Sequence, residues 1–266
     1  MSNLNDGIKP CLHYYNISPK VAAFSTTRHG GFSHGLYGQF NINRYCGDDD
    51  ACVDKNLEIL SKELNIDKNN IIMPHQTHGT ETRLIAEEFL SLPFSTRSMV
   101  LEGVDSVMTN VRNVCIGVST ADCIPIILYD NAHHACAAVH AGWRGTVKKI
   151  VEKTVETMRI AYDSHLESLF AVIGPGISLD AFEVGDEVYE EFASSGFNMP
   201  DISNHQGGKW HIDLPGCNLK QLINLGLPEK NITATGVCTY NNTDEYFSAR
   251  RLGTLSGRIY TGILLK

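Results

Sequence analysis

Apolar residues recur along the chain with helical spacing in three segments and with strand-like spacing in eight. Helical spacing is found in residues 50–64, 146–158 and 185–195. The first of these segments begins with acidic residues, and the second is entered through a Gly-Thr cap. Short apolar runs predict strands; these runs are VAAFSTT, DSVMTN, VCIGVST, IPIILYD, HACAAVHAG, LFAVIGPGIS, KWHIDL and ITATGVCTY. Because strands and helices alternate unevenly, the pattern predicts an α/β or α+β domain in which helices cover a large sheet system.

The longest stretch without periodicity runs from residue 87 to residue 103. We interpret it as a surface loop, with a lid as its candidate role. No repeat, low-complexity tract or long linker divides the 266 residues, a length typical of one large domain or two small ones. We therefore expect one domain over residues 1–266, with residues 1–20 as its N-terminal extension.

Composition and charge exclude several classes of function. The chain has 22 basic and 30 acidic residues and a formal net charge of −8, which disfavours sequence-independent binding of DNA or RNA. It shows no basic amphipathic helix, no apolar run near the roughly 20 residues of a membrane span, and no apolar core in its N-terminal MSNLNDGIKP. These features predict a cytoplasmic protein that binds neither nucleic acid nor membrane, and we expect a monomer.

Reactive side chains are concentrated in four segments, which are PHQTHG (74–79), STADCIPI (119–126), AVHAGWRGT (138–146) and CTYNNTDEYFSARR (238–251). His140 ends an apolar strand beside glycines, and loops at strand ends often line ligand pockets. Cys123 follows Asp122 at the junction of two strands. His75 and His78 would face opposite sides of a strand, so at most one of them joins a given site.

His78, Cys123 and His140 therefore form a candidate ligand set. Zinc accepts two imidazole nitrogens and one thiolate, and three protein ligands leave a fourth position open, as catalytic zinc sites require. The spacing alone leaves a second interpretation open, in which the three residues are satisfied independently. The other histidines show no ligand spacing, and the eight cysteines include no C-x-x-C pair typical of a structural zinc site.

One apparent catalytic motif is rejected. GFSHG, at residues 31–35, matches the G-x-S-x-G nucleophile elbow, but that motif requires a helix directly after it. The following LYGQFNINRY has no helical periodicity, so we do not expect Ser33 to be a nucleophile. The chain also lacks the G-x-x-x-x-G-K-[ST] and G-x-G-x-x-G phosphate loops.

Seven segments together resemble the bacterial YfiH/DUF152 family, whose members are called laccase-domain proteins, polyphenol oxidases, purine nucleoside phosphorylases and peptidoglycan editing factors. In chain order they are TTRHGGFSHGLYGQFNIN, PHQTHGT, GVDSVMTN, STADCIPIILYD, AAVHAGWRGT, IGPGIS…FEVGDEV and CTY…YFSARR. The resemblance extends from about residue 24 to residue 258. It implies a single-domain, four-layer α/β/β/α sandwich with mixed sheets, of the α+β class.

The resemblance also implies roles for individual residues. The zinc ligands of the family match the candidate set described above. The substrate-binding and phosphate-binding residues that the resemblance suggests are Arg28, Asn41, Gln76, Arg250 and Arg251. Ala249 departs from the family pattern, in which an aromatic or larger residue often precedes the arginine pair.

The activity names of the family disagree, and the residues decide between them in part. A multicopper laccase needs many histidine ligands in close pairs such as H-x-H, and this chain has 11 histidines and no such pair. Laccase chemistry is therefore disfavoured, although Cu²⁺ can occupy a zinc site because it binds the same ligands more tightly. A zinc-activated water instead suits attack on a purine carbon.

Phosphorolysis needs a local anion site in a chain of net charge −8. The candidates are Arg28, Arg144, Arg250 and Arg251, since a guanidinium binds phosphate bidentately. A structural ion pair is an equal alternative for Arg144. We thus predict a zinc enzyme that cleaves adenosine, inosine and methylthioadenosine with phosphate and that deaminates adenosine.

Two carboxylates and three alternatives complete the prediction. Asp122 or Asp105 could act as acid and base or could orient a metal ligand. The first alternative is a hydrolase that edits peptidoglycan precursors, with Cys123 as nucleophile and His140 as base. The others are a copper-dependent polyphenol oxidase and a zinc-binding protein without turnover.

Overall fold

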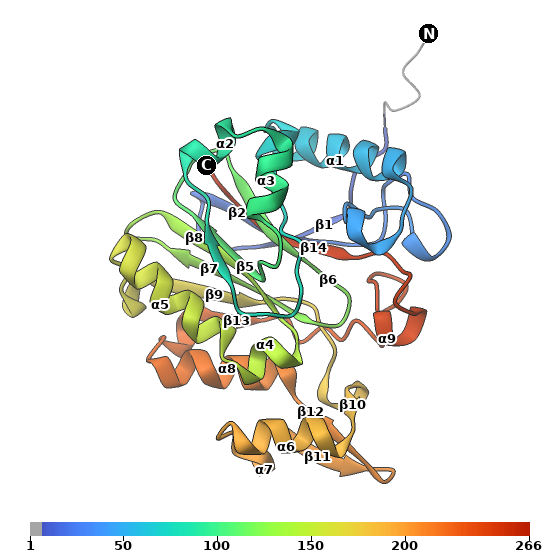
Figure 1. Ribbon diagram of the computed structural model, residues 1–266, viewed down its shortest axis with the longest axis vertical. Coiled ribbons are helices and arrows are strands. Elements are labelled where there is room, and N and C mark those ends of the chain that lie inside the picture. The colour runs from blue at the N-terminus through green and yellow to red at the C-terminus, as the bar shows by residue number, and fades with distance from the viewer. Residues whose placement is uncertain (1–6) are drawn as a thin grey trace.

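Two large mixed β-sheets form the centre of the molecule, which the computed structural model describes over residues 7–266 (Figure 1). The five-stranded sheet has the order β1 (Leu12–Tyr15), β2 (Val21–Thr26), β14 (Ile259–Leu265), β6 (Cys115–Thr120) and β3 (Ile71–Ile72). The six-stranded sheet has the order β13 (Ile232–Ala234), β9 (Leu169–Ile173), β7 (Ile124–Asp130), β8 (Ala135–Ala141), β5 (Ser106–Thr109) and β4 (Thr82–Leu84). A small third sheet has the order β10 (Glu183–Val184), β12 (Lys209–Ile212) and β11 (Ser203–Gln206). Neighbouring strands are parallel only in the pairs β3–β6, β4–β5 and β9–β13 among the described residues.

Alternation along the strands explains how the two large sheets share one core. In β7, Ile126 and Leu128 pack on the helical side of the six-stranded sheet, whereas Ile127 and Tyr129 pack with residues of the five-stranded sheet. Ile263 of β14 belongs to this inner core as well. Because β7 is buried on both faces, its sequence is a nearly continuous apolar run instead of an alternating one.

Helices cover the outer face of each large sheet. Helix α1 (Asp50–Leu64) packs Leu60 against Phe24 and Tyr260 of the five-stranded sheet. Helices α5 (Ile150–Tyr162) and α8 (Leu214–Leu225) pack on the six-stranded sheet. Figure 1 shows α1 above the sheets and α5 and α8 below them. The four-layer α/β/β/α sandwich implied by the family resemblance is thereby confirmed.

The remaining helices are short. They are α2 (Glu87–Ser91), α3 (Phe94–Val100), α4 (Trp143–Val147), α6 (Asp186–Ser194), α7 (Met199–Ile202) and α9 (Ala249–Leu252). Helices α6 and α7 accompany the three-stranded sheet, which projects from the body of the molecule in Figure 1. Among residues 7–266, no helix is long and apolar enough to cross a membrane.

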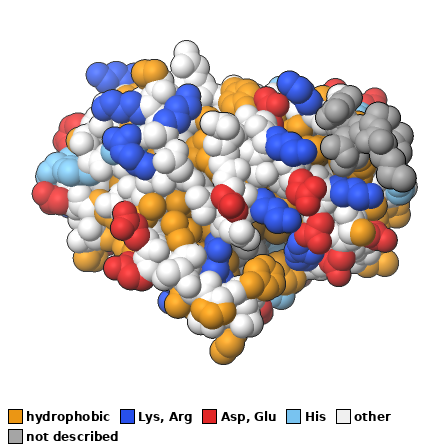
Figure 2. All heavy atoms as spheres, turned by 90° about the horizontal axis from the view of Figure 1, so that it is seen from above, with side chains coloured by type: hydrophobic (Ala, Val, Ile, Leu, Met, Phe, Trp, Pro, Cys, Tyr) orange, Lys and Arg blue, Asp and Glu red, His pale blue; other side chains and the backbone are white. Residues whose placement is uncertain are grey.

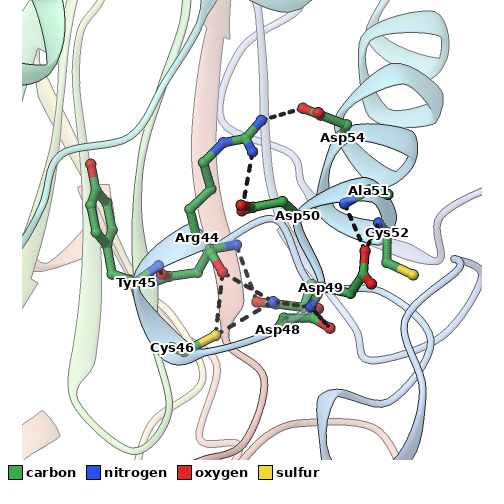
Figure 3. A network of polar contacts seen from close by, with 11 residues as sticks. Arg44, Tyr45, Cys46, Asp48, Asp49, Asp50, Ala51, Cys52 and Asp54 are labelled. Atoms are coloured by element: carbon green, nitrogen blue, oxygen red, sulfur yellow. Dashed lines mark hydrogen bonds and ion pairs between the residues drawn. The ribbon is translucent and has the colours of Figure 1, made fainter. Parts of the chain in front are cut away.

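Acidic residues fix the start of α1, as Figure 3 shows. Asp49 is the N-cap residue, and its carboxylate accepts hydrogen bonds from the backbone N–H groups of Ala51 (2.7 Å) and Cys52 (3.2 Å). Arg44 forms ion pairs with Asp50 and Asp54 in the first turns of the helix. Carboxylates at this end satisfy free N–H groups and favour the helix dipole.

The predicted helices at residues 50–64 and 185–195 are confirmed, but the boundary of the one at residues 146–158 is wrong. The chain forms α4 first, and Lys149 then adopts a φ of 60° as the N-cap of α5. This left-handed residue interrupts the helix and makes the following apolar stripe begin at Ile150.

The prediction of a surface loop at residues 87–103 is also wrong, because α2 and α3 occupy most of it. Pro93 stands between them as the N-cap of α3 and keeps each helix too short to show a periodic pattern. Phe89 and Leu101, only 6% and 7% exposed, anchor the segment to the inner core.

Several short elements and two larger ones are missing from the predicted set. Strand β14 occupies the middle of the five-stranded sheet, and α8 contributes to the outer core, yet neither is among the predicted elements. The expected N-terminal extension at residues 1–20 lies partly outside the described residues, since residues 1–6 are not described. Its described part contains β1, which pairs with β2 at the sheet edge.

Candidate metal centre

Three separate connections bring His78, Cys123 and His140 together. His78 lies in the loop that follows β3, Cys123 lies in the turn between β6 and β7, and His140 lies near the end of β8. One ligand atom from each side chain falls within 4.8 Å of the other two. Cys123 Sγ lies 3.8 Å from His78 Nε2, and the two imidazole rings meet edge to face. The ligand set expected from the sequence is thus assembled in space.

The group lies where the buried sheet end meets the surface. His140 is 3% exposed, Cys123 is partly buried and His78 is exposed. His78 has a φ of 63°, so this loop residue takes the left-handed conformation that residues other than glycine seldom adopt. The turn directs the His78 ring towards Cys123. His75 is excluded from the group by this loop and not by strand alternation, because neither histidine lies in one of the named strands.

Gly142 leaves the space that the ligand atoms need. A Cβ atom placed there would lie 2.9 Å from His78 Cδ2 and 3.1 Å from Cys123 Sγ. Its φ of −70° is open to any residue, so the requirement for glycine is steric and not conformational. Sequence reasoning missed this residue, although it stands two positions after His140.

The Asp105 carboxylate accepts hydrogen bonds from both histidines of the group. Its Oδ1 accepts hydrogen bonds from His140 Nδ1 (2.7 Å) and from the backbone N–H of His78 (2.9 Å). Its Oδ2 accepts hydrogen bonds from the backbone N–H groups of Gly79 (2.7 Å) and Thr77 (3.2 Å). The carboxylate is fully buried. Asp105 therefore orients two candidate ligands, and these contacts make a proton-transfer role a poor fit.

Electrostatics favour a thiolate at Cys123 and a charged imidazole at His140 when only protein groups are considered. Burial raises the pKa of the Cys123 thiol, but His140 and then His78 outweigh it and bring the pKa down to about 6. Burial lowers the pKa of His140, but Cys123 and then Asp105 raise it to about 9. Burial also opposes ionisation of Asp105, and its hydrogen bonds with His140 and the backbone nevertheless leave its pKa below the ordinary value.

The donor set fits a tetrahedral metal ion. With Zn–S near 2.3 Å and Zn–N near 2.0–2.1 Å, a sulfur and a nitrogen ligand lie about 3.6 Å apart, close to the observed 3.8 Å between Cys123 and His78. The Nδ1–H of His140 is held by Asp105, which leaves Nε2 as its ligand atom. Among the described residues, this is the one group of three His, Cys, Asp or Glu side chains with such spacing.

Two of the predicted substrate-binding residues are engaged in structural contacts. The Gln76 side chain donates to the Ser119 carbonyl and accepts from the Ser119 N–H, both at 2.8 Å. Asn41 is fully buried, donates to Asp48 and accepts from the backbone of Arg258. Gln76 thereby fastens the loop of His78 to Ser119, whereas Asn41 links its own loop to Asp48 and Arg258. The role of both residues towards a substrate stays a prediction.

Histidine 75 and Ser33 lie outside the metal group. His75 contacts Glu102 through Nδ1 at 2.8 Å and stacks on Tyr45 with ring centroids 3.9 Å apart. Ser33 is buried, and its hydroxyl donates to Asp48 at 2.6 Å. A short 3-10 turn, not an α-helix, follows Ser33, as the rejection of the nucleophile elbow anticipated.

Each of the four candidate arginines lies over an aromatic ring. The distances from the guanidinium carbon to the ring centroid are 5.1 Å for Arg28 over Phe247, 4.2 Å for Arg144 over Trp143, 5.5 Å for Arg250 over Phe182 and 4.9 Å for Arg251 over Tyr240. A ring at such a distance attracts a guanidinium and limits its movement. The Arg28 and Arg250 guanidinium groups each also donate to a backbone carbonyl, of Thr243 and of Glu183. Arg144 forms no ion pair with any described residue.

A cavity of about 150 Å³ lies between α1 and α3. Its lining is mainly apolar, with Ile42, Leu57 and Met73 among the lining residues and Arg97 also contributing. Figure 2 shows this face, where apolar side chains lie among basic and acidic ones. The cavity shares no residue with the metal group, so it is a separate feature of the surface.

Comparison with known proteins shows the family to which the chain belongs. The model of a family described as multi-copper polyphenol oxidoreductase laccase matches residues 22–266. The chain belongs to this family. A Bacillus licheniformis hypothetical protein called YfiH has the same fold, with a TM-score of 0.88 and 25% identity over 97% of each chain. The YfiH/DUF152 resemblance is thereby confirmed.

Two proteins similar to this chain bear names from nucleoside metabolism. A purine nucleoside phosphorylase of Bacteroides thetaiotaomicron is 43% identical over 261 residues, which cover 97% of each chain. Adenosine deaminase RL5, from an unknown prokaryotic organism, is 41% identical over 248 residues, or 92% of this chain and 94% of the relative. These names support an enzyme that acts on purine nucleosides.

Proposed function

We propose that the protein is a zinc-dependent enzyme that cleaves adenosine, inosine and methylthioadenosine with phosphate and that also deaminates adenosine. The observation that supports this most directly is the group of His78, Cys123 and His140, with two imidazoles and one thiolate at the surface end of a sheet. We further propose, from the sequence alone, that the protein is a cytoplasmic monomer.

Zinc held by His78, Cys123 and His140 would supply Lewis acidity at neutral pH. The protein's part is to fix its ligands. Asp105 keeps the proton of His140 on Nδ1, so Nε2 presents a lone pair to the site. The same carboxylate holds the left-handed turn at His78 through the backbone. Cys123, as a thiolate, offsets part of the charge of a divalent ion.

The anion required for phosphorolysis would be bound by arginines. Arg250 is linked to the residue before Cys123, because its backbone N–H donates to Asp122 at 2.7 Å. Arg144 follows Gly142 by two residues and is exposed. A guanidinium held over an aromatic ring loses less freedom when it binds phosphate than a free one does, which makes these side chains suitable for the role.

Copper can bind the same ligands, and oxidation of phenols would require this copper-bound form. A true multicopper mechanism needs a further cluster of histidine ligands. The described residues contain one three-residue His/Cys/His group and no second one of this kind. We therefore favour zinc and nucleoside chemistry over the oxidase activity in the family description.

One observation favours a second candidate, a cysteine-type hydrolase, for which the family resemblance suggests peptidoglycan precursors as substrates. Cys123, His140 and Asp105 form a chain in which a low-pKa thiol faces an imidazole that a buried carboxylate orients. A nucleophile, its base and an orienting group have this relationship in cysteine hydrolases. The two candidates differ in whether Cys123 is free to react when metal is present.

The proposal is tested by incubating the purified protein with adenosine and phosphate and identifying the products. Adenine with ribose 1-phosphate reports phosphorolysis, and inosine or hypoxanthine reports deamination. His78→Ala should abolish both activities and remove the metal. His75→Ala is a matched control, because His75 belongs to the same loop but contacts Glu102. Absence of all these products with the zinc-loaded wild-type protein would overturn the proposal.

A further inference from the structure

Asp122 combines backbone strain with burial. Its φ is 86°, in the left-handed region that residues other than glycine seldom adopt. The residue is 9% exposed, and its carbonyl oxygen accepts a hydrogen bond from the N–H of Ile177 at 2.8 Å. A conformation of this kind persists when the surrounding contacts hold it in place.

Both carboxylate oxygens of Asp122 bind the C-terminal segment 238–251. Oδ1 accepts a hydrogen bond from the Thr239 hydroxyl at 2.8 Å, and Oδ2 accepts one from the backbone N–H of Arg250 at 2.7 Å. Hydrogen bonds to an ionised carboxylate are stronger than neutral ones. The two bonds fasten two separate points of the segment to the residue that precedes Cys123.

The guanidinium groups of this segment are positioned by other contacts. Arg250 lies over Phe182 and donates to the Glu183 carbonyl at 3.0 Å. Arg251 lies over Tyr240. The aromatic rings therefore set the directions of the two side chains, whereas Asp122 sets the place of the Arg250 backbone relative to the Cys123 turn.

From these contacts we propose that Asp122 is a positioning residue, which acts through Arg250 to form a phosphate-binding site beside the metal group. The proposal rests on the proposed function, because phosphate is the second substrate of phosphorolysis. It replaces the acid–base role expected for Asp122 from the sequence, since the contacts of both carboxylate oxygens suit anchoring better than proton transfer.

The test measures binding of inorganic phosphate to the zinc-loaded protein by calorimetry, which requires no turnover. Asp122→Ala should weaken phosphate binding roughly ten- to a hundred-fold, as misplacement of a binding group by about 1 Å does, while the zinc content stays at the wild-type level. Asp122→Asn should restore most of the affinity, because an amide can accept from the Arg250 N–H and donate to the Thr239 hydroxyl. Thr239→Val should lie between the two.

A double-mutant cycle shows whether Asp122 acts through Arg250. If it does, Asp122→Ala should add little to the loss already caused by Arg250→Ala. Hydrogen exchange gives a second readout, since the backbone amide of Arg250 should exchange faster in Asp122→Ala than in the wild type. Unchanged phosphate affinity or fully additive effects in the cycle would overturn the proposal, as would absence of phosphate binding by the wild type.

Product analysis separates this proposal from the proposed function. A wild-type protein that binds phosphate in an Asp122-dependent way but forms no nucleoside products would refute the proposed function and leave the anion site standing. Nucleoside phosphorolysis with a KM for phosphate that Asp122→Ala leaves unchanged would do the reverse. Phosphorolysis with a KM for phosphate raised in Asp122→Ala, and deamination reduced less, would support both.

Discussion

Replacement of Asp105 by asparagine should weaken metal binding, because the Asp105 carboxylate orients two of the three candidate ligands. The carboxylate accepts four hydrogen bonds, from His140 Nδ1 and from the backbone of Thr77, His78 and Gly79. Asparagine keeps the shape of the side chain but has one acceptor oxygen only. Its amide group would direct N–H donors towards backbone N–H donors on one side of the side chain.

The expected magnitude follows from these contacts. Hydrogen bonds to charged groups contribute about 1.5–3 kcal/mol each, and breaking a buried charged pair costs about 3–5 kcal/mol. We therefore expect the free energy of unfolding of the metal-free protein to fall by about 3–5 kcal/mol. Loss of a carboxylate that orients a histidine ligand typically lowers metal affinity about ten- to a hundred-fold, and the same loss is expected for zinc in this protein.

The assay is a competitive zinc titration with a chromophoric chelator, combined with urea unfolding of the metal-free protein. Asp130→Asn is a matched control, because Asp130 is equally buried and also contacts a histidine, His133, at 2.8 Å. Asp130 lies at the other end of β7, so its variant should lose stability but bind zinc as the wild type does. Wild-type zinc affinity in folded Asp105→Asn would refute the reasoning.

Three other predictions concern the site and the fold. Gly142→Ala should lower zinc affinity, because its Cβ would lie 3.1 Å from Cys123 Sγ, and metal titration checks this. Gly145→Ala should bind zinc normally, because its Cβ would lie 3.3 Å from Ile150 and would make only ordinary contacts, at 3.4 Å or more, with the backbone of Gly79 and His140. Burial raises the pKa of Asp130, but the hydrogen bonds of its carboxylate outweigh burial and hold this pKa below the ordinary 3.8. The carboxylate therefore stabilises the fold above pH 3.8, and this contribution is lost as the pH falls towards the lowered pKa. In denaturant titrations, the difference in the free energy of unfolding between wild type and Asp130→Asn should shrink below pH 3.8, and a pH-independent difference would contradict this. Arg28→Ala should slow phosphorolysis about ten- to a hundred-fold, as expected for a lost charged contact of about 1.5–3 kcal/mol, and slow deamination less; equal losses in the two steady-state assays would mean that Arg28 only supports the fold.

The sequence predicted the inner strands of the sandwich well, for a physical reason. Strands β7 and β8 are buried on both faces, so their apolar runs stand out without any knowledge of their neighbours. The prediction for residues 87–103 was wrong because Pro93 divides the segment into two helices that are too short to show a periodic pattern. The break at Lys149 could not be predicted because residue type does not reveal that a lysine adopts the left-handed conformation.

The candidate ligands could be proposed from residue types, but their proximity could not. His78, Cys123 and His140 come from three connections that only the sheet order brings together. The function of Asp105 depends on hydrogen bonds of up to 3.2 Å to its carboxylate. The function of Gly142 depends on Cys123 Sγ, which would lie 3.1 Å from a Cβ atom at that position. Such contacts arise between segments far apart in the chain, and no local pattern encodes them.

Alkylation of Cys123 tests the metal centre most directly. A thiolate bound to zinc shares its charge with the metal and resists alkylation, whereas a free thiolate beside an imidazole reacts fast. Iodoacetamide adducts are mapped by mass spectrometry in the zinc-loaded protein, with and without a chelator. We predict slow labelling of Cys123 with zinc, fast labelling after chelation and failure of the labelled protein to bind zinc again. Rapid labelling of Cys123 in the zinc-loaded protein, at a rate that the chelator leaves unchanged, would contradict the metal centre and favour the cysteine hydrolase.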